Sequence, residues 1–133
     1  MVNTKAEAPK AVQICKYPPL GVPGLGGERR TLYGGAEYDQ RANDEIAVII
    51  QIETAEALGN DEETLSVPEI DAFFIGPNDL SASMGMALSL DNPGPRFKSA
   101  IQKLIEVGKK HGVAPEIHCG SAESLNERAA MGF

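Results

Sequence analysis

The stretch FFIGPNDLSASMG, residues 73–85, decides the fold because it leads from an apolar strand through a carboxylate into a helix. Four apolar residues, 72–75, predict a buried strand, and Gly76 with Pro77 ends it. Asn78 and Asp79 follow, before an expected short helix over 80–84. Two interpretations of this order stay open. Either Asn78 or Asp79 caps or begins the helix, or Asp79 holds a metal ion at the end of the strand.

The same order of a strand followed by a helix recurs along the chain. Expected strands cover 46–53, 70–75 and 113–117, and expected helices cover 54–66, 97–110 and 122–131. This alternation predicts an α/β fold with a parallel sheet and crossover helices. Ligands of such sheets bind at the carboxyl ends of the strands.

A second carboxylate stands at the end of the strand IAVIIQIE, residues 46–53. Strand alternation places Gln51 and Glu53 on one face. Consecutive strands are usually neighbours, so Glu53 and Asp79 should reach the same edge of the sheet. Two carboxylates there suit a hard cation such as Mg²⁺ or Mn²⁺. The alternative is that Glu53 starts the helix after Thr54, since acidic residues favour a first helical turn.

The first 45 residues are less regular. A helix is expected over 4–16, with Thr4 as its N-cap, Glu7 completing a capping box and Pro9 as a possible kink. A long loop rich in Gly and Pro follows over 17–35, and a short helix is expected over 36–45. His118 is more typical of a core or strand-end histidine than of a metal ligand, and His111 is expected at a helix C-terminus.

Composition excludes several classes of protein. The 133 residues predict one domain, 1–133, with 42% hydrophobic residues. The net charge of −7 without a basic stripe makes nucleic acid an improbable partner. The longest apolar run, residues 46–50, is too short for a bilayer, and the first residues lack the apolar core of a signal peptide. Cys15 and Cys119 are expected as reduced thiols of a cytoplasmic protein with no membrane partner.

Four segments together resemble one family: KYPPLGVPGLGG, ANDEIAVIIQIETAEAL, VPEIDAFFIGPNDLSASMG and GKKHGVAPEIHCGSAE. They are similar to the HpcH/HpaI aldolase/citrate lyase family of class II pyruvate aldolases. The resemblance implies a (β/α)₈ TIM barrel that cleaves a 4-hydroxy-2-oxo acid into pyruvate and an aldehyde. It implies Mg²⁺, Mn²⁺ or Co²⁺ held by Glu53 and Asp79, and a keto acid bound by Gln51, Asn78 and Asp79.

Several features depart from the family pattern. Pro23 replaces an Arg, while Glu69 and Glu116 replace glycines expected near strand starts. A full barrel needs about 250 residues, so this chain carries roughly four βα units. The first four residues resemble the fourth strand of the family barrel. The family's general-base His and its Arg would lie upstream, so the catalytic residues are unknown and the isolated chain is expected to have little activity.

Two alternatives remain. The chain could be a half-barrel that binds or assembles without turnover, and its exposed edges predict a homo-oligomer. It could also be a phosphoenolpyruvate or acyl-CoA lyase relative of the same barrel class.

Overall fold

A parallel sheet organises the structure, a computed structural model that describes residues 1–133. The strands β1 (Ile49–Gln51), β2 (Ala72–Ile75) and β3 (Ala114–Ile117) lie in the order β1-β2-β3, with Gln51, Phe74 and Glu116 in register. The Val2 N–H donates to the Gln51 carbonyl at 3.0 Å, so the N-terminal segment lies beside β1. The parallel α/β arrangement expected from the sequence is confirmed.

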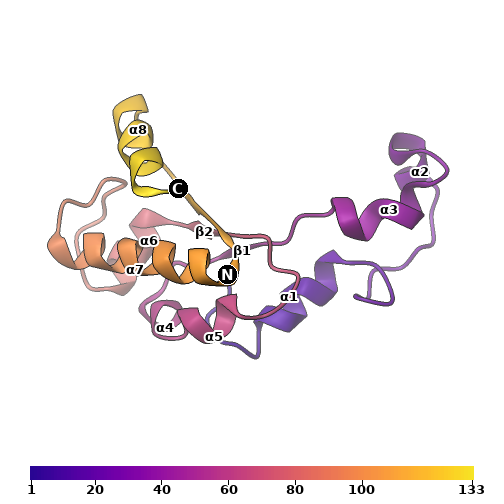
Figure 1. Ribbon diagram of the computed structural model, residues 1–133, viewed down its shortest axis with the longest axis horizontal. Coiled ribbons are helices and arrows are strands. Elements are labelled where there is room, and N and C mark those ends of the chain that lie inside the picture. The colour runs from indigo at the N-terminus through magenta and orange to yellow at the C-terminus, as the bar shows by residue number, and fades with distance from the viewer.

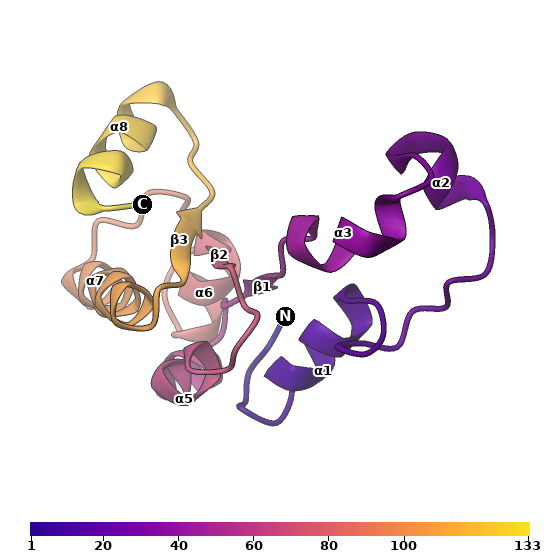
Figure 2. The same cartoon turned by 45° about the vertical axis from the view of Figure 1, so that its right-hand side comes forward.

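One face of the sheet is covered and the other is open. Phe73 and Ile75 are fully buried against the helices, whereas Ile49 on the opposite face is 51% exposed. The main covering helix is α7 (Pro95–His111), which buries Phe97, Ile101 and Leu104 (Figure 2). Alternation along the strands therefore leaves Gln51, Phe74 and Glu116 on the open face.

A glycine allows α7 to approach the sheet closely. A Cβ on Gly108 would lie 2.7 Å from Phe73 Cε1 and 2.7 Å from the Val113 carbonyl oxygen. Such contacts are too short for any larger residue. The helix ends at His111, and the next residue, Gly112, has a φ of 72° that provides the left-handed turn into β3.

The other helices are short. They are α1 (Ala8–Cys15), α2 (Arg29–Gly34), α3 (Tyr38–Glu45), α4 (Ala55–Gly59), α5 (Asp61–Leu65), α6 (Pro77–Ser83) and α8 (Ala122–Met131). Residues 17–45, here called the arm, carry α2 and α3 away from the sheet (Figure 1). The base of the arm is held by the buried Lys16, whose Nζ donates to the Asn43 carbonyl at 2.6 Å and the Ile46 carbonyl at 2.7 Å.

The expected first helix is wrong at its start. Helix α1 begins at Ala8, and Glu7 rather than Thr4 is its N-cap. The Glu7 carboxylate instead accepts hydrogen bonds from the Asn3 and Thr4 N–H groups, at 2.7 and 3.2 Å. Pro9 causes no kink because it lies in the first turn, where no hydrogen bond is lost. The expected loop over 17–35 also contains α2.

The structure shifts other boundaries. All three strands begin later than predicted, and the helix expected over 54–66 is divided at Asn60 into α4 and α5. Asn60 donates its side-chain N–H to the Asn3 carbonyl at 2.9 Å, a long-range contact that local sequence does not reveal. The helix expected over 80–84 begins earlier, at Pro77, whose fixed φ suits a first turn.

The two unusual glutamates occupy different positions. Glu69 precedes β2 with a φ of 68°, a left-handed conformation that glycine adopts more easily. Its Oε2 lies 3.8 Å from Lys16 Nζ. We expected Glu116 near a strand start. It is instead the third residue of β3 and is exposed on the open face. Nothing in the structure explains Pro23.

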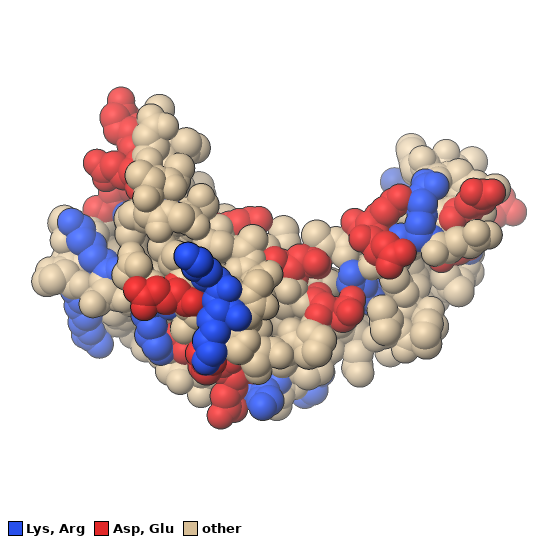
Figure 3. Space-filling model, viewed as in Figure 1, with Lys and Arg blue, Asp and Glu red and all other residues tan.

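Surface charge is mixed. Figure 3 shows Lys and Arg side chains interspersed with Asp and Glu on the face that it displays. No helix has both the length and the apolar character that crossing a membrane requires. Both cysteines are free thiols.

Candidate functional site

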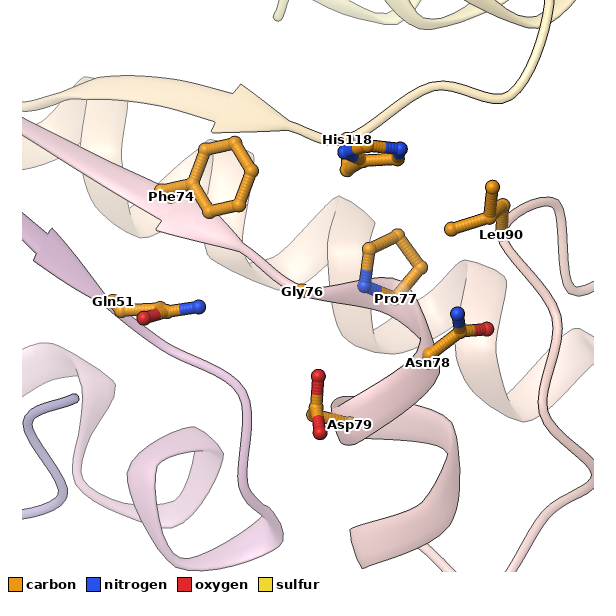
Figure 4. A pocket seen from close by; sticks show the side chains of 8 residues that line it. All are labelled: Gln51, Phe74, Gly76, Pro77, Asn78, Asp79, Leu90 and His118. Atoms are coloured by element: carbon orange, nitrogen blue, oxygen red, sulfur yellow. The ribbon is translucent and has the colours of Figure 1, made fainter.

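A small polar pocket opens where the three strands end. Its volume is about 230 Å³, which is below the range of about 300–1,000 Å³ typical of pockets for drug-sized ligands. It is lined by Gln51, Phe74, Gly76, Pro77, Asn78, Asp79, Leu90 and His118 (Figure 4). This is the edge at which the sequence predicts a ligand site.

The structure brings the Glu53 and Asp79 carboxylates together across Gly76. A Cβ on Gly76 would lie 2.5 Å from Glu53 Oε2 and 3.5 Å from Asp79 Oδ2, so these two oxygens are at most about 6 Å apart. Two ligands of one Mg²⁺, each at about 2.1 Å, lie no more than about 4 Å apart, a separation that this bound allows. The absence of a side chain at residue 76 keeps the space between strand and carboxylates open.

The electrostatics of this pair favour a cation. Glu53 is only 8% exposed. Burial, and then the negative charge of Asp79, raise the pKa of the Glu53 carboxyl above its ordinary value, and they outweigh the opposite effects of the N-terminal ammonium and of the Gln51 hydrogen bond. None of the ion pairs of the structure involves either carboxylate. A buried carboxylate beside another negative charge is costly without a positive partner.

The donor set fits a hard divalent ion. Gln51 Nε2 donates to Glu53 Oε2 at 2.6 Å and so orients the carboxylate. No third His, Cys, Asp or Glu completes a cluster. Mg²⁺ commonly uses one or two carboxylates and leaves its other positions to water and substrate, so a two-carboxylate site is adequate.

Neither acid caps a helix, but Asp79 does lie in the first turn of α6, as the alternative interpretation expected. Thr54 is the N-cap of α4, and its Oγ1 accepts the Ala57 N–H at 3.0 Å, so Glu53 does not fill that role. Gly76 occupies the N-cap position of α6, which has no side-chain cap bond. Asp79 is therefore the third residue of that helix, and it lines the pocket with Asn78 and Gln51.

The sequence analysis assigned Gln51, Asn78 and Asp79 of the lining residues to a site, whereas Glu53 is not itself a lining residue. The lining residues that it did not assign are Phe74, Gly76, Pro77, Leu90 and His118. His118 follows β3 directly, and its main-chain N–H donates to the Ile75 carbonyl at 3.3 Å. Strand alternation places it on the same face as Glu116, but only the register of β2 with β3 brings that face to the pocket.

Residues 1–128 match the sequence model described as HpcH/HpaI aldolase/citrate lyase. The chain belongs to this family. It is 38% identical over 133 residues to a hydroxypyruvate/pyruvate aldolase of Rhizorhabdus wittichii, covering all of this chain and 53% of the relative. It is 42% identical over 121 residues to a 4-hydroxy-2-oxo-heptane-1,7-dioate aldolase of Shigella flexneri, covering 88% of this chain and 44% of that protein.

The fold agrees with the family. A solved structure of an HpcH/HpaI aldolase/citrate lyase family protein from Burkholderia cenocepacia superposes with a TM-score of 0.89 at 31% identity. The superposition covers all of this chain and 53% of the Burkholderia cenocepacia protein. The chain thus spans about half the length of the relatives it matches, and it corresponds to part of a (β/α)₈ barrel.

Proposed function

We propose that the chain belongs to a metal-dependent carbon–carbon lyase of the aldolase type, which cleaves a 4-hydroxy-2-oxo acid into pyruvate and an aldehyde. The observation that carries the proposal is the meeting of Glu53 and Asp79 at Gly76, where neither carboxylate forms an ion pair. The aldolase names of the two relatives support the reaction class, and favour it over a phosphoenolpyruvate or acyl-CoA lyase.

Each residue has a defined role in this proposal. Glu53 and Asp79 hold Mg²⁺, Mn²⁺ or Co²⁺, and Gln51 fixes the Glu53 carboxylate through its 2.6 Å hydrogen bond. A bound cation supplies Lewis-acid stabilisation of the negative charge that develops on a keto acid when its carbon–carbon bond breaks. Asn78 lies at the pocket wall, where its amide can donate to a substrate oxygen. The relatives extend well beyond this chain, so we propose that the 133 residues bind substrate without efficient turnover.

Binding of Mn²⁺ tests the proposal directly. The free Mn²⁺ signal in electron paramagnetic resonance is expected to fall when the protein is added, and pyruvate is expected to strengthen binding of the ion. The reason is that keto acid and carboxylates would share one coordination shell. An undiminished Mn²⁺ signal, or pyruvate binding that is the same without any divalent ion, would contradict the proposal.

A second proposal concerns assembly. Five apolar side chains of the arm are exposed: Leu20, Val22, Leu25, Leu32 and Tyr33, with exposed fractions of 44% to 83%. A surface of this kind is typical of an interaction site, so we propose that the protein is a homo-oligomer. We also propose a cytoplasmic location, which the free thiols of Cys15 and Cys119 support.

Light scattering coupled to size exclusion measures the assembly. We expect a mass above 14.1 kDa that falls to this value when Leu32 and Tyr33 are changed to Ser. A monomeric parent chain at high concentration would refute the assembly proposal and leave the metal site untouched.

A further inference from the structure

The pocket has a wall opposite the Asp79 carboxylate, and His118 forms part of this wall. We propose that His118 contacts the far end of the bound 2-oxo acid and selects ligands that carry a second carboxylate there. This inference rests on the proposed function, because it assumes that the keto end of the ligand lies at Glu53 and Asp79.

Strand register places His118 at this wall. Gln51, Phe74 and Glu116 lie in register on the open face of the sheet, and His118 follows two residues after Glu116 on the same face. Figure 4 shows His118 and Asp79 on opposite sides of the pocket, with Pro77 between them. A ligand anchored near Asp79 and extending along the pocket would therefore reach the imidazole.

The chemistry of the lining supports an anionic far end. No Lys or Arg lines the pocket, and His118 is the one lining side chain that can carry a positive charge. Its ring nitrogens make no hydrogen bond within the protein, so an N–H is available to a ligand. In either tautomer or when protonated, an imidazole can donate to a carboxylate oxygen.

Apolar side chains flank His118 at the far end of the pocket. Phe74 and Leu90 line the pocket on either side of His118 (Figure 4). Leu90 also approaches the segment after β3, because a Cβ on Gly120 would lie 3.2 Å from Leu90 Cδ1. These side chains suit the methylene groups of a short aliphatic chain, while the polar groups at each end bind its carboxylates.

The fold does not depend on the imidazole. The link from His118 to β2 uses its main-chain N–H, and its side chain is exposed. His111 differs, because its Nε2 lies 2.8 Å from Glu62 Oε1 in a contact between α7 and α5. The chain has only these two histidines, so His111 is an internal control that is removed from the pocket.

Two ligands of equal carbon length provide the test. Imidazole carbon-bound protons are observed by NMR with saturating Mg²⁺, during titration with 2-oxoglutarate or with 2-oxopentanoate, which lacks the second carboxylate. We expect 2-oxoglutarate to shift the His118 signals, to leave those of His111 in place, and to bind about tenfold more tightly, the effect of one hydrogen bond to a charged group. His111→Gln assigns the two sets of signals.

Variants at residue 118 complete the experiment. His118→Phe is expected to equalise the two affinities by weakening 2-oxoglutarate only, and His118→Gln, which retains a donor, to restore part of the preference. Equal binding of both ligands to the parent protein, with His118 signals unmoved, would overturn this inference and leave the proposed function standing. Failure of both ligands to bind in Mg²⁺ would overturn the proposed function, and this inference with it.

Discussion

Glu53→Gln is expected to raise the melting temperature of the metal-free protein and to abolish its stabilisation by Mg²⁺ with pyruvate. In the metal-free state the substitution removes a buried negative charge that lies near Asp79. In the presence of Mg²⁺ and pyruvate, the substitution removes one of the two carboxylates proposed to coordinate the metal ion. A purely structural acid would not give these two opposite effects, so the pair of measurements identifies the role of Glu53.

The loss of stabilisation by Mg²⁺ with pyruvate is expected to be the larger of the two effects. A ligand at 100 times its dissociation constant stabilises the native state by about 2.7 kcal/mol, which corresponds to roughly 10 °C in a domain of this size. Asp79→Asn should abolish the same shift. Glu56→Gln is the matched control, because Glu56 is an exposed acid three residues away in α4. A full ligand-induced shift in Glu53→Gln would refute the metal site.

The pH dependence of the metal-free protein provides a second measurement of the same residue. The pKa of Glu53 is raised in the folded state by burial and then by Asp79. An acid of this kind contributes stability that is fully present below its unfolded pKa, and that stability is lost as pH rises through the folded pKa. Urea unfolding should show this decline above about pH 4.5, and Glu53→Gln should reduce it, whereas Glu56→Gln should not.

Gly76→Ala is expected to weaken Mn²⁺ binding by about 10- to 100-fold, the usual effect of disturbing the support of a metal ligand. The new Cβ would lie 2.5 Å from Glu53 Oε2, so the carboxylate must leave its present position. Gly76 has a φ of −90° and a ψ of 99°, which alanine adopts without strain. The backbone should therefore be retained while the site is displaced.

Gly59→Ala is the control for this variant. Gly59 ends α4, and nothing lies within 4 Å of the position that its Cβ would take. Its Mn²⁺ affinity should equal that of the parent chain, as measured by the free-ion signal. Unchanged Mn²⁺ affinity in Gly76→Ala would show that the ion, if it binds, does so away from the space between Glu53 and Asp79.

The features that the sequence predicted correctly are those that local patterns encode. The alternation of apolar strands and amphipathic helices predicted the parallel sheet, and the acids that follow two strands predicted the edge at which the pocket lies. These features are local, because a strand of period two or a helix of period 3.6 is visible within one segment. The sequence also showed Gly76 three residues before Asp79, but it did not show why that residue is a glycine.

The resemblance of four segments to a known family was equally accessible from the sequence, and the family is confirmed. The exact boundaries of the helices and strands could not be predicted from the sequence. Helix α1 begins at Ala8 because the Glu7 carboxylate is engaged by Asn3 and Thr4, and the division at Asn60 accompanies its contact with Asn3. Such bonds depend on how segments meet, which no local pattern encodes.

The sequence by itself determined that two acids follow buried strands and that the sheet is parallel. Only the tertiary structure decided that Glu53 and Asp79 meet across Gly76 and that His118 lies on the opposite wall. The physical reason is that alternation assigns a side chain to a face, whereas strand register assigns it a neighbour. Register depends on the packing of α7 and the other helices against the whole sheet.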